Sequence, residues 1–187
     1  NCNFVLLTSH CSLTYPKPMN TPSLSKSVLE KLSEIVGADY VLTSNEDRIC
    51  YAYDGQRTEY VPDAIVRPIN AEQISKILIL ANDASFPVVP RGAGTGLSGG
   101  SVASSGGVVL DLTRMNKIVE LDAGNQHMIV EPGVITAAIV GAAEKIGLLY
   151  PPDPGSVNVS TIGGNVAENA GGLRAGKYGV TRNYLMQ

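Results

Sequence analysis

Pro-Arg-Gly-Ala-Gly-Thr-Gly-Leu-Ser-Gly-Gly, residues 90–100, is the stretch that decides the fold of this chain. Five of its eleven positions are glycine, and the apolar pair Val88-Val89 precedes it. Glycine allows positive φ angles and a close approach of the backbone to a ligand, and successive amide N–H groups in such a turn form an anion-binding nest. A loop of Gly, Thr and Ser with one Arg beside it suits a diphosphate. The stretch therefore predicts a site for a nucleotide-type cofactor.

Part of this stretch, Gly94 to Gly99, matches the dinucleotide fingerprint G-x-G-x-x-G. That fingerprint also needs a helix that opens at the loop. Residues 99–107 hold four glycines and three serines instead, a composition that disfavours a helix. The sequence therefore argues against a nicotinamide site of the Rossmann type.

Another glycine-rich stretch, residues 171–178, imitates the P-loop as far as Lys177. Tyr178 stands where a Ser or Thr must reach magnesium, and no strand leads into the segment. A kinase or ATPase is therefore disfavoured. Ordinary surface turns remain an alternative for both blocks, but two separate blocks of this density favour a ligand role.

The composition bounds the class of protein. The chain has 187 residues, a net charge of −3, 44% hydrophobic residues and 17% charged residues. This length and balance fit one domain with a real core, of the α/β or α+β class. The sequence has no basic patch for nucleic acid and no apolar run near the roughly 20 residues of a membrane helix. Its three cysteines and two histidines show no metal-ligand spacing.

Apolar periodicity predicts the secondary structure. Helices are expected at 23–37, 71–85 and 135–146, and strands at 64–67, 88–89, 108–112, 117–121 and 127–131. The segment 64–90 should form a strand–helix–strand unit with parallel strands. Ligands of such sheets bind at the carboxyl ends of the strands, which is where residues 91–100 fall. The last two strands should form a hairpin with a five-residue loop.

Three motifs in order resemble the flavin domain of the vanillyl-alcohol oxidase/p-cresol methylhydroxylase (PCMH) superfamily. They are residues 90–100, Pro-Pro-Asp-Pro-Gly-Ser at 151–156, and Thr-Ile-Gly-Gly-Asn-Val-Ala-Glu-Asn-Ala-Gly-Gly-Leu-Arg at 161–174. The resemblance is strongest to FAD-linked 2-hydroxyacid dehydrogenases and oxidases of the glycolate oxidase D subunit and D-lactate dehydrogenase type. It implies an α+β fold, a PCMH-type FAD-binding domain of two α/β subdomains that is truncated at its C-terminal end. The domain should span 23–187, divided at about 113/114, after a disordered leader or added segment at 1–22.

The resemblance also implies how FAD is held. Its diphosphate should lie on the first glycine block, residues 90–100. Its flavin and ribityl group should lie against the second block, residues 161–165 and 170–172, with main-chain amides of both blocks converging on FAD. The residues assigned to FAD are Pro90, Arg91, Gly92, Ala93, Gly94, Thr95, Gly96, Ser98, Pro154, Gly155, Ser156, Thr161, Gly163, Gly164, Asn165 and Gly171. Many relatives attach FAD covalently through a histidine in the first block. Thr95 holds that position here, so FAD is expected to be non-covalent.

Three charged residues near these motifs allow more than one role. Arg91 could neutralise a phosphate, or it could be a surface arginine held by a carboxylate. Asp153 is expected to be a turn residue rather than a general base, and Glu168 to be structural or exposed.

The activity implied by the resemblance is oxidation of a 2-hydroxyacid, such as glycolate or D-lactate, to the 2-oxoacid by hydride transfer to the flavin. The substrate cap should follow residue 187, so no catalytic or metal-binding residue is assigned and the chain alone should turn over little substrate. The implied partners are the hydroxyacid and an electron acceptor or redox subunit. The implied location is the cytoplasm, with membrane association only through a partner, or the mitochondrion in a eukaryote. Two alternatives remain: the flavin domain of a sugar-alcohol or aldonolactone oxidase, and a non-catalytic nucleotide-binding subunit.

Overall fold

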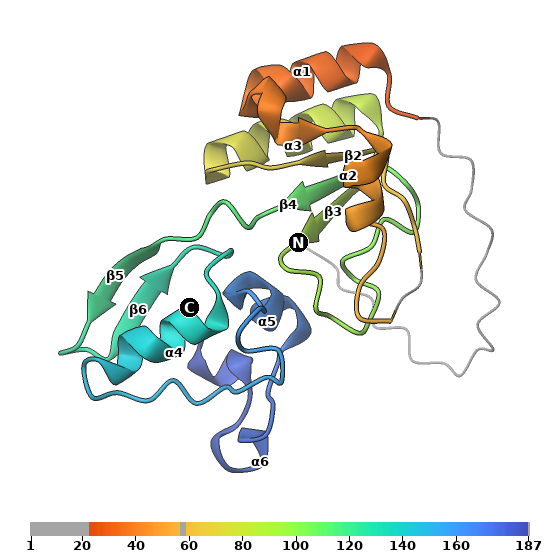
Figure 1. Cartoon of the computed structure of the whole chain (residues 1–187). Coiled ribbons are helices and arrows are strands. Elements are labelled where there is room, and N and C mark those ends of the chain that lie inside the picture. The colour runs from red at the N-terminus through yellow and green to blue at the C-terminus, as the bar shows by residue number, and fades with distance from the viewer. Residues whose placement is uncertain (1–22, 57–58, 187) are drawn as a thin grey trace.

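The computed structural model describes residues 23–56 and 59–186, which form two β-sheets flanked by helices (Figure 1). The larger sheet has four strands in the order β1-β2-β4-β3. These strands are β1 (Val41–Leu42), β2 (Ala64–Val66), β3 (Val88–Arg91) and β4 (Val108–Asp111). The smaller sheet is a hairpin of β5 (Ile118–Asp122) and β6 (His127–Val130). The leader predicted at 1–22 lies outside the described residues.

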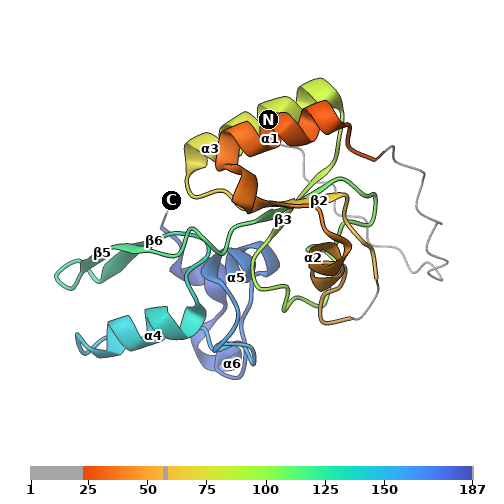
Figure 2. The same cartoon turned by 45° about the horizontal axis from the view of Figure 1, so that its top comes forward.

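Two helices cover one face of the four-stranded sheet, and a short one lies on the other side (Figure 2). The covering pair is α1 (Lys26–Val36) and α3 (Ala71–Ala84), and the short helix is α2 (Asn45–Cys50). The N-cap side chain of each covering helix accepts a hydrogen bond from a backbone amide of the first turn. The N-cap residue is Ser25 for α1 and Asn70 for α3. These two helices confirm the predictions at 23–37 and 71–85, whereas α2 was not predicted.

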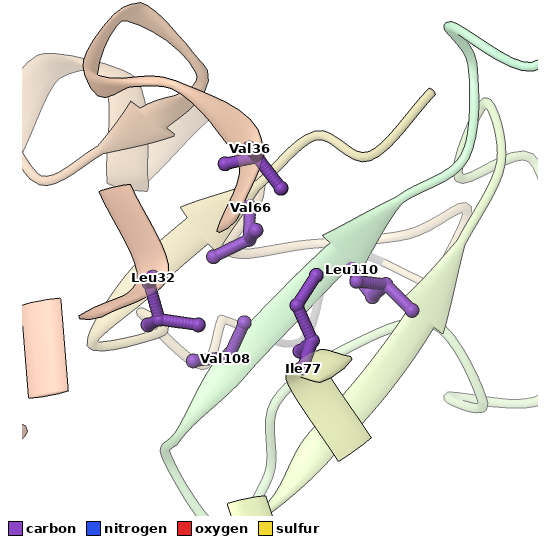
Figure 3. Packing of buried hydrophobic residues seen from close by; sticks show 6 residues of the cluster. All are labelled: Leu32, Val36, Val66, Ile77, Val108 and Leu110. Carbon is purple, nitrogen blue, oxygen red and sulfur yellow. The ribbon is translucent and has the colours of Figure 1, made fainter. Parts of the chain in front are cut away.

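Successive side chains of the central strands point to opposite faces of the sheet, so the core has two layers. One layer, beneath the covering helices, consists of Leu32, Val36, Val66, Ile77, Val108 and Leu110 (Figure 3). The intervening strand residues Ile65 and Val109 point to the other face, where they pack with Ala103. Both strands are therefore buried on both faces, as parallel strands in α/β units are. Each fully buried aliphatic side chain contributes about 1.5–3 kcal/mol to this core.

The strands β2 and β3 are parallel, as predicted, but they are not neighbours. Strand β4 lies between them and is parallel to both. The register pairs Val66 with Leu110 and Arg91 with Asp111, so the carboxyl ends of all three strands meet at one edge of the sheet. The first glycine block begins at this edge.

The rest of the chain packs around a second core of Val134, Ile139 and Ile162. It comprises the hairpin, α4 (Thr136–Glu144), α5 (Ile162–Glu168), α6 (Ala175–Tyr178) and a 3₁₀ turn at Thr181–Tyr184. Another 3₁₀ turn, at Ala38–Tyr40, lies between α1 and β1. The predicted hairpin and the helix at 135–146 are confirmed, while α5 and α6 were not predicted. The boundary at 113/114 between two subdomains stays a proposal. In the described part of the chain, every helix is too short or too polar to span a bilayer.

Candidate functional site

The first glycine block forms an open turn directly after β3. Gly94 and Gly99 adopt left-handed φ angles of 71° and 80°, which favour glycine. No helix begins between Gly92 and Gly107; these residues form turns and bends before β4. The nicotinamide site of the Rossmann type is therefore excluded by the geometry as well as by the composition.

The turn presents a run of main-chain amides that have no acceptor. Within residues 23–56 and 59–186, the N–H groups of residues 92–98 donate no hydrogen bond. The following amide, that of Gly99, donates to Oδ2 of Asp54 at 2.9 Å. Residues 92–96 are half-buried and residues 97 and 98 exposed, so these amides are accessible to solvent or to a ligand. A run of them at the carboxyl edge of parallel strands fits an anionic group such as a diphosphate.

A buried guanidinium lies beneath this turn. Arg91 is 7% exposed, and a Cβ added at Gly94 would be 2.1 Å from its Nη2 atom. Its Nη1 donates to the carbonyl of Ser101 at 3.2 Å, and its Cζ lies 5.5 Å from the ring centroid of Tyr51. Among the described residues no carboxylate forms an ion pair with it, so the surface-arginine alternative is wrong. Burial lowers the pKa of Arg91, and a bound anion would offset the cost of burying its charge.

A second buried group holds the same edge of the sheet together. Asp111 is 1% exposed, and its Oδ2 accepts hydrogen bonds from the Tyr51 hydroxyl at 2.7 Å and from Nε of Arg67 at 2.9 Å. Burial, and then the hydrogen bond to Asp111, raise the pKa of Tyr51 to about 12. Tyr51 therefore stays protonated and keeps its ring beside Arg91. Neither Tyr51 nor Asp111 was predicted from the sequence.

The two glycine blocks meet in the structure. A Cβ added at Gly92 would be 2.0 Å from Oγ1 of Thr161, the residue that caps α5. At the other end of α5, Glu168 accepts a hydrogen bond from the hydroxyl of Ser98. Helix α5 thus lies along the first block and contacts it near both of its ends. Glu168 is exposed, as expected.

The amides of the second block are not free at the start of α5, contrary to the expectation that both blocks offer amides. Gly163 donates to the carbonyl of Pro132 at 2.8 Å, and Gly164 and Asn165 donate to Thr161. Packing within the protein accounts for Gly163, since a Cβ there would lie 2.8 Å from Cβ of Pro132. The protein itself therefore supplies the acceptors for the amides at the start of α5.

Other predicted residues of the second block lie in the protein interior. Asn165 is 3% exposed, and its Nδ2 donates to Oγ1 of Thr136 at 2.7 Å. That hydroxyl also bonds with Ser160, so the three side chains form a buried polar network. Gly171 packs closely as well, because an added Cβ would be 2.9 Å from Val180.

The proline-rich segment 151–156 is fastened beside the second block. The amide of Asp153 donates to the carbonyl of Gly171 at 2.9 Å, and its carboxylate lies 3.5 Å from Nε of Arg174. Gly172 has a φ of +87°, and a Cβ there would overlap the Asp153 carbonyl. The three predicted residues of this segment differ in exposure: Pro154 is buried, Ser156 half-buried and Gly155 exposed.

Ser101, near the turn, was not predicted from the sequence. Oγ of Ser101 is buried, and within the described residues it has no hydrogen-bond partner. The carbonyl of the same residue accepts the bond from Arg91. A buried hydroxyl without a partner fits a polar group of a bound cofactor. The only sequence signal was its place directly after the first block.

A group of potential metal ligands lies on the hairpin. One ligand atom from each of Glu120, Asp122 and His127 lies within 4.8 Å of the others. Both oxygens of Asp122 already accept bonds from Asn125 in the hairpin turn, and these bonds lower the pKa of Asp122. The turn therefore accounts for the position of this carboxylate.

Comparison with known proteins identifies the family. Residues 62–187 match the model of the FAD binding domain. The chain is 46% identical over 164 residues to glycolate oxidase subunit GlcD of Bacillus subtilis, covering 87% of this chain and 35% of that protein. It is 41% identical to D-lactate dehydrogenase of Anaerostipes hadrus, with 87% and 34% covered. The chain thus spans about a third of the length of these curated relatives.

The fold is also that of a solved flavoprotein. The structure superposes on p-cresol methylhydroxylase with a TM-score of 0.65 and 23% identity, over 77% of this chain and 29% of that one. This likeness supports the PCMH-type fold alone. Together with the match over residues 62–187, it shows that the chain belongs to the FAD-binding domain family and has the PCMH-type α+β fold.

Proposed function

We propose that this chain is the flavin-binding part of an oxidoreductase that oxidises a 2-hydroxyacid, such as glycolate or D-lactate, to the 2-oxoacid. The FAD-binding family supports the cofactor. The relatives named as a glycolate oxidase subunit and a D-lactate dehydrogenase support the substrate class. The hydroxyacid, an electron acceptor or redox subunit, and a cytoplasmic location belong to the same proposal for the whole protein.

The observation that carries the proposal is the run of acceptor-free amides at 92–98 above a buried guanidinium. The amides of residues 92–96 would hold the FAD diphosphate, with the Thr95 hydroxyl as a further donor. The Ser98 hydroxyl would add another donor by turning from Glu168 to the diphosphate. Arg91 would balance the negative charge from beneath the turn. Segment 154–156 and the second block would line the flavin and ribityl group.

Bound FAD supplies the acceptor for the hydride that leaves the substrate carbon. This chain's residues bind and orient it. The first block fixes the diphosphate by main-chain bonds, and α5 places Thr161 directly against that block. Thr95 cannot form the histidyl bond to a flavin, so the proposed attachment is non-covalent.

Titration of the chain with FAD tests the cofactor site. Quenching of flavin fluorescence should saturate, ADP should compete, and riboflavin should bind much more weakly because it lacks the diphosphate. Saturation by riboflavin at the same concentrations as FAD would contradict a diphosphate cradle. Absence of any saturable FAD binding would end the proposal.

The substrate class needs the protein extended beyond residue 187. Under anaerobic conditions, glycolate or D-lactate should bleach the visible flavin absorbance of that longer protein. Bleaching by a sugar alcohol or an aldonolactone, with none by any 2-hydroxyacid, would favour the alternative enzyme on the same fold.

A further inference from the structure

We infer that Asp54 is the positioning residue that orders the first glycine block for FAD. Asp54 precedes the residues that match the FAD-binding family, which begin at 62. The inference rests on the proposed function, because it assigns a second segment of the chain to the same cofactor site.

The side chain of Asp54 is buried and fully engaged with main-chain amides. It is 5% exposed. Its Oδ2 accepts the amide of Gly99 at 2.9 Å, and its Oδ1 accepts the amide of Gln56 at 2.8 Å. Hydrogen bonds to a carboxylate are stronger than those between neutral groups. The bond to Gly99 therefore fixes the far end of the block at the residue where its left-handed turn occurs.

The residues after Asp54 hold two carbonyls of the block. The amide of Gly55 donates to the carbonyl of Gly96 at 2.9 Å, and Nε2 of Gln56 donates to the carbonyl of Leu97. We call residues 54–56 the support segment. It bonds to three positions of the block, namely the carbonyls of Gly96 and Leu97 and the amide of Gly99.

These bonds determine where two of the acceptor-free amides, those of Leu97 and Ser98, point. In a trans peptide the carbonyl of one residue and the N–H of the next point in opposite directions, and the described chain has no cis peptide bond. Since the Gly96 and Leu97 carbonyls point to the support segment, the N–H groups of Leu97 and Ser98 point away from it. The support segment thereby keeps these donors free for a ligand on the other side of the turn.

The charge of Asp54 has a partner as well. Asp54 is among the groups whose negative charge favours the protonated form of the buried Arg91. A neutral side chain would leave Arg91 with less compensation. Asp54 therefore supports the block both through its bonds and through its charge.

Asp63 offers a matched control. Its Oδ2 accepts the amide of Gly107 at 2.9 Å, and Gly107 also has a positive φ, of 82°. Gly107 precedes β4, at the end of the strand opposite to the first block. Asp63→Asn therefore removes the same kind of bond away from the proposed site.

The test compares Asp54→Asn with Asp63→Asn in the 187-residue chain. Three quantities are measured: the thermal midpoint, hydrogen exchange of the Gly55, Gln56 and Gly99 amides without flavin, and the Kd for FAD from fluorescence quenching. Both variants should lower the thermal midpoint, and Asp54→Asn should lower it more, because Asp54 is buried and accepts two amides. Only Asp54→Asn should accelerate exchange at these three amides, and it should raise the Kd for FAD about tenfold, as expected for loss of one charge-assisted bond.

Gln56→Ala is a second variant, and it should fold as the wild-type chain does because Gln56 is exposed. It removes only the bond to the Leu97 carbonyl and should raise the Kd about threefold, within the range of a neutral hydrogen bond. This variant decides the matter if Asp54→Asn does not fold.

The outcomes separate the two proposals. If the wild-type chain binds FAD and Asp54→Asn binds it as Asp63→Asn does, the inference is wrong and the proposed function stands. If the wild-type chain does not bind FAD, the proposed function is wrong. Exchange of the Gly55, Gln56 and Gly99 amides then still shows whether Asp54 orders the block, and unchanged exchange in Asp54→Asn would overturn the inference.

Discussion

Replacing Gly94 with alanine should destabilise the flavin-free chain by about 2.5–5 kcal/mol. The new Cβ would lie 2.1 Å from Nη2 of Arg91 and 2.4 Å from its Cζ, so the guanidinium must move. The φ of +71° at this position adds a backbone cost of about 1–2 kcal/mol for a residue with a Cβ. Displacing the buried Arg91 from its bond to the Ser101 carbonyl adds about 1.5–3 kcal/mol.

Gly99→Ala is the matched control for this experiment. Its φ of +80° imposes the same backbone cost, but nothing lies within 4 Å of the added Cβ. Gly99→Ala should therefore cost only about 1–2 kcal/mol. The assay is urea unfolding of each flavin-free variant, followed by fluorescence or circular dichroism, with the m-values compared to check that unfolding stays two-state.

A double-mutant cycle isolates the contact between Gly94 and Arg91. In an Arg91→Ala background the clash is absent, so Gly94→Ala should cost no more than Gly99→Ala does. Equal destabilisation by Gly94→Ala and Gly99→Ala in the wild-type background would refute the packing of Arg91 beneath the turn. The role of Arg91 as the cation under a diphosphate would then lose its structural basis.

Three other predictions address the cofactor and the buried edge of the sheet. Glu168→Gln should lower the Kd for FAD several-fold at low salt and less at high salt. The Glu168 carboxylate is hydrogen-bonded to Ser98 beside the proposed diphosphate, so its negative charge repels the phosphates. An unchanged Kd would count against that placement. Flavin should leave the protein on acid precipitation, because Thr95 cannot bind it covalently, and flavin that stays with the pellet would contradict this. The pKa of Tyr51 is raised from 10.0 to about 12 in the folded chain, so its contribution to stability is complete below pH 10 and is lost as the pH rises towards 12. Wild-type unfolding midpoints should fall more steeply than those of Tyr51→Phe across this window, and parallel curves would show that Tyr51 is not the group responsible.

Local patterns predicted the elements that position the first block. The helices α1, α3 and α4 and the β5–β6 hairpin follow from apolar spacing and turn residues, which act over short distances. Helix α5 was missed because Gly163 and Gly164 disfavour a helix. It forms because Thr161 caps it and because Ile162 and Asn165 are buried. Those contributions come from tertiary packing, which the local sequence does not contain.

The candidate site shows the same division. The position of the acceptor-free amides after β3 could be predicted from the glycine pattern and the strand before it. The support of those amides could not, because Asp54 and Gly99 are 45 positions apart and Tyr51 and Asp111 are 60 apart. The expectation of free amides at the start of α5 was wrong for a similar reason. The amides of Ile162 and Gly163 donate to the carbonyls of Val134 and Pro132, about 30 residues earlier in the chain.

The contact between Gly92 and Thr161 joins the four-stranded sheet to the unit built around α5. A ligand bound where Gly92 meets Thr161 would contact both the sheet and the α5 unit, so its binding would stabilise both. Each half then resists unfolding partly through the other, by an amount that grows with the logarithm of ligand concentration. Binding of a ligand to this one loop should thereby couple the unfolding of the sheet to that of the α5 unit.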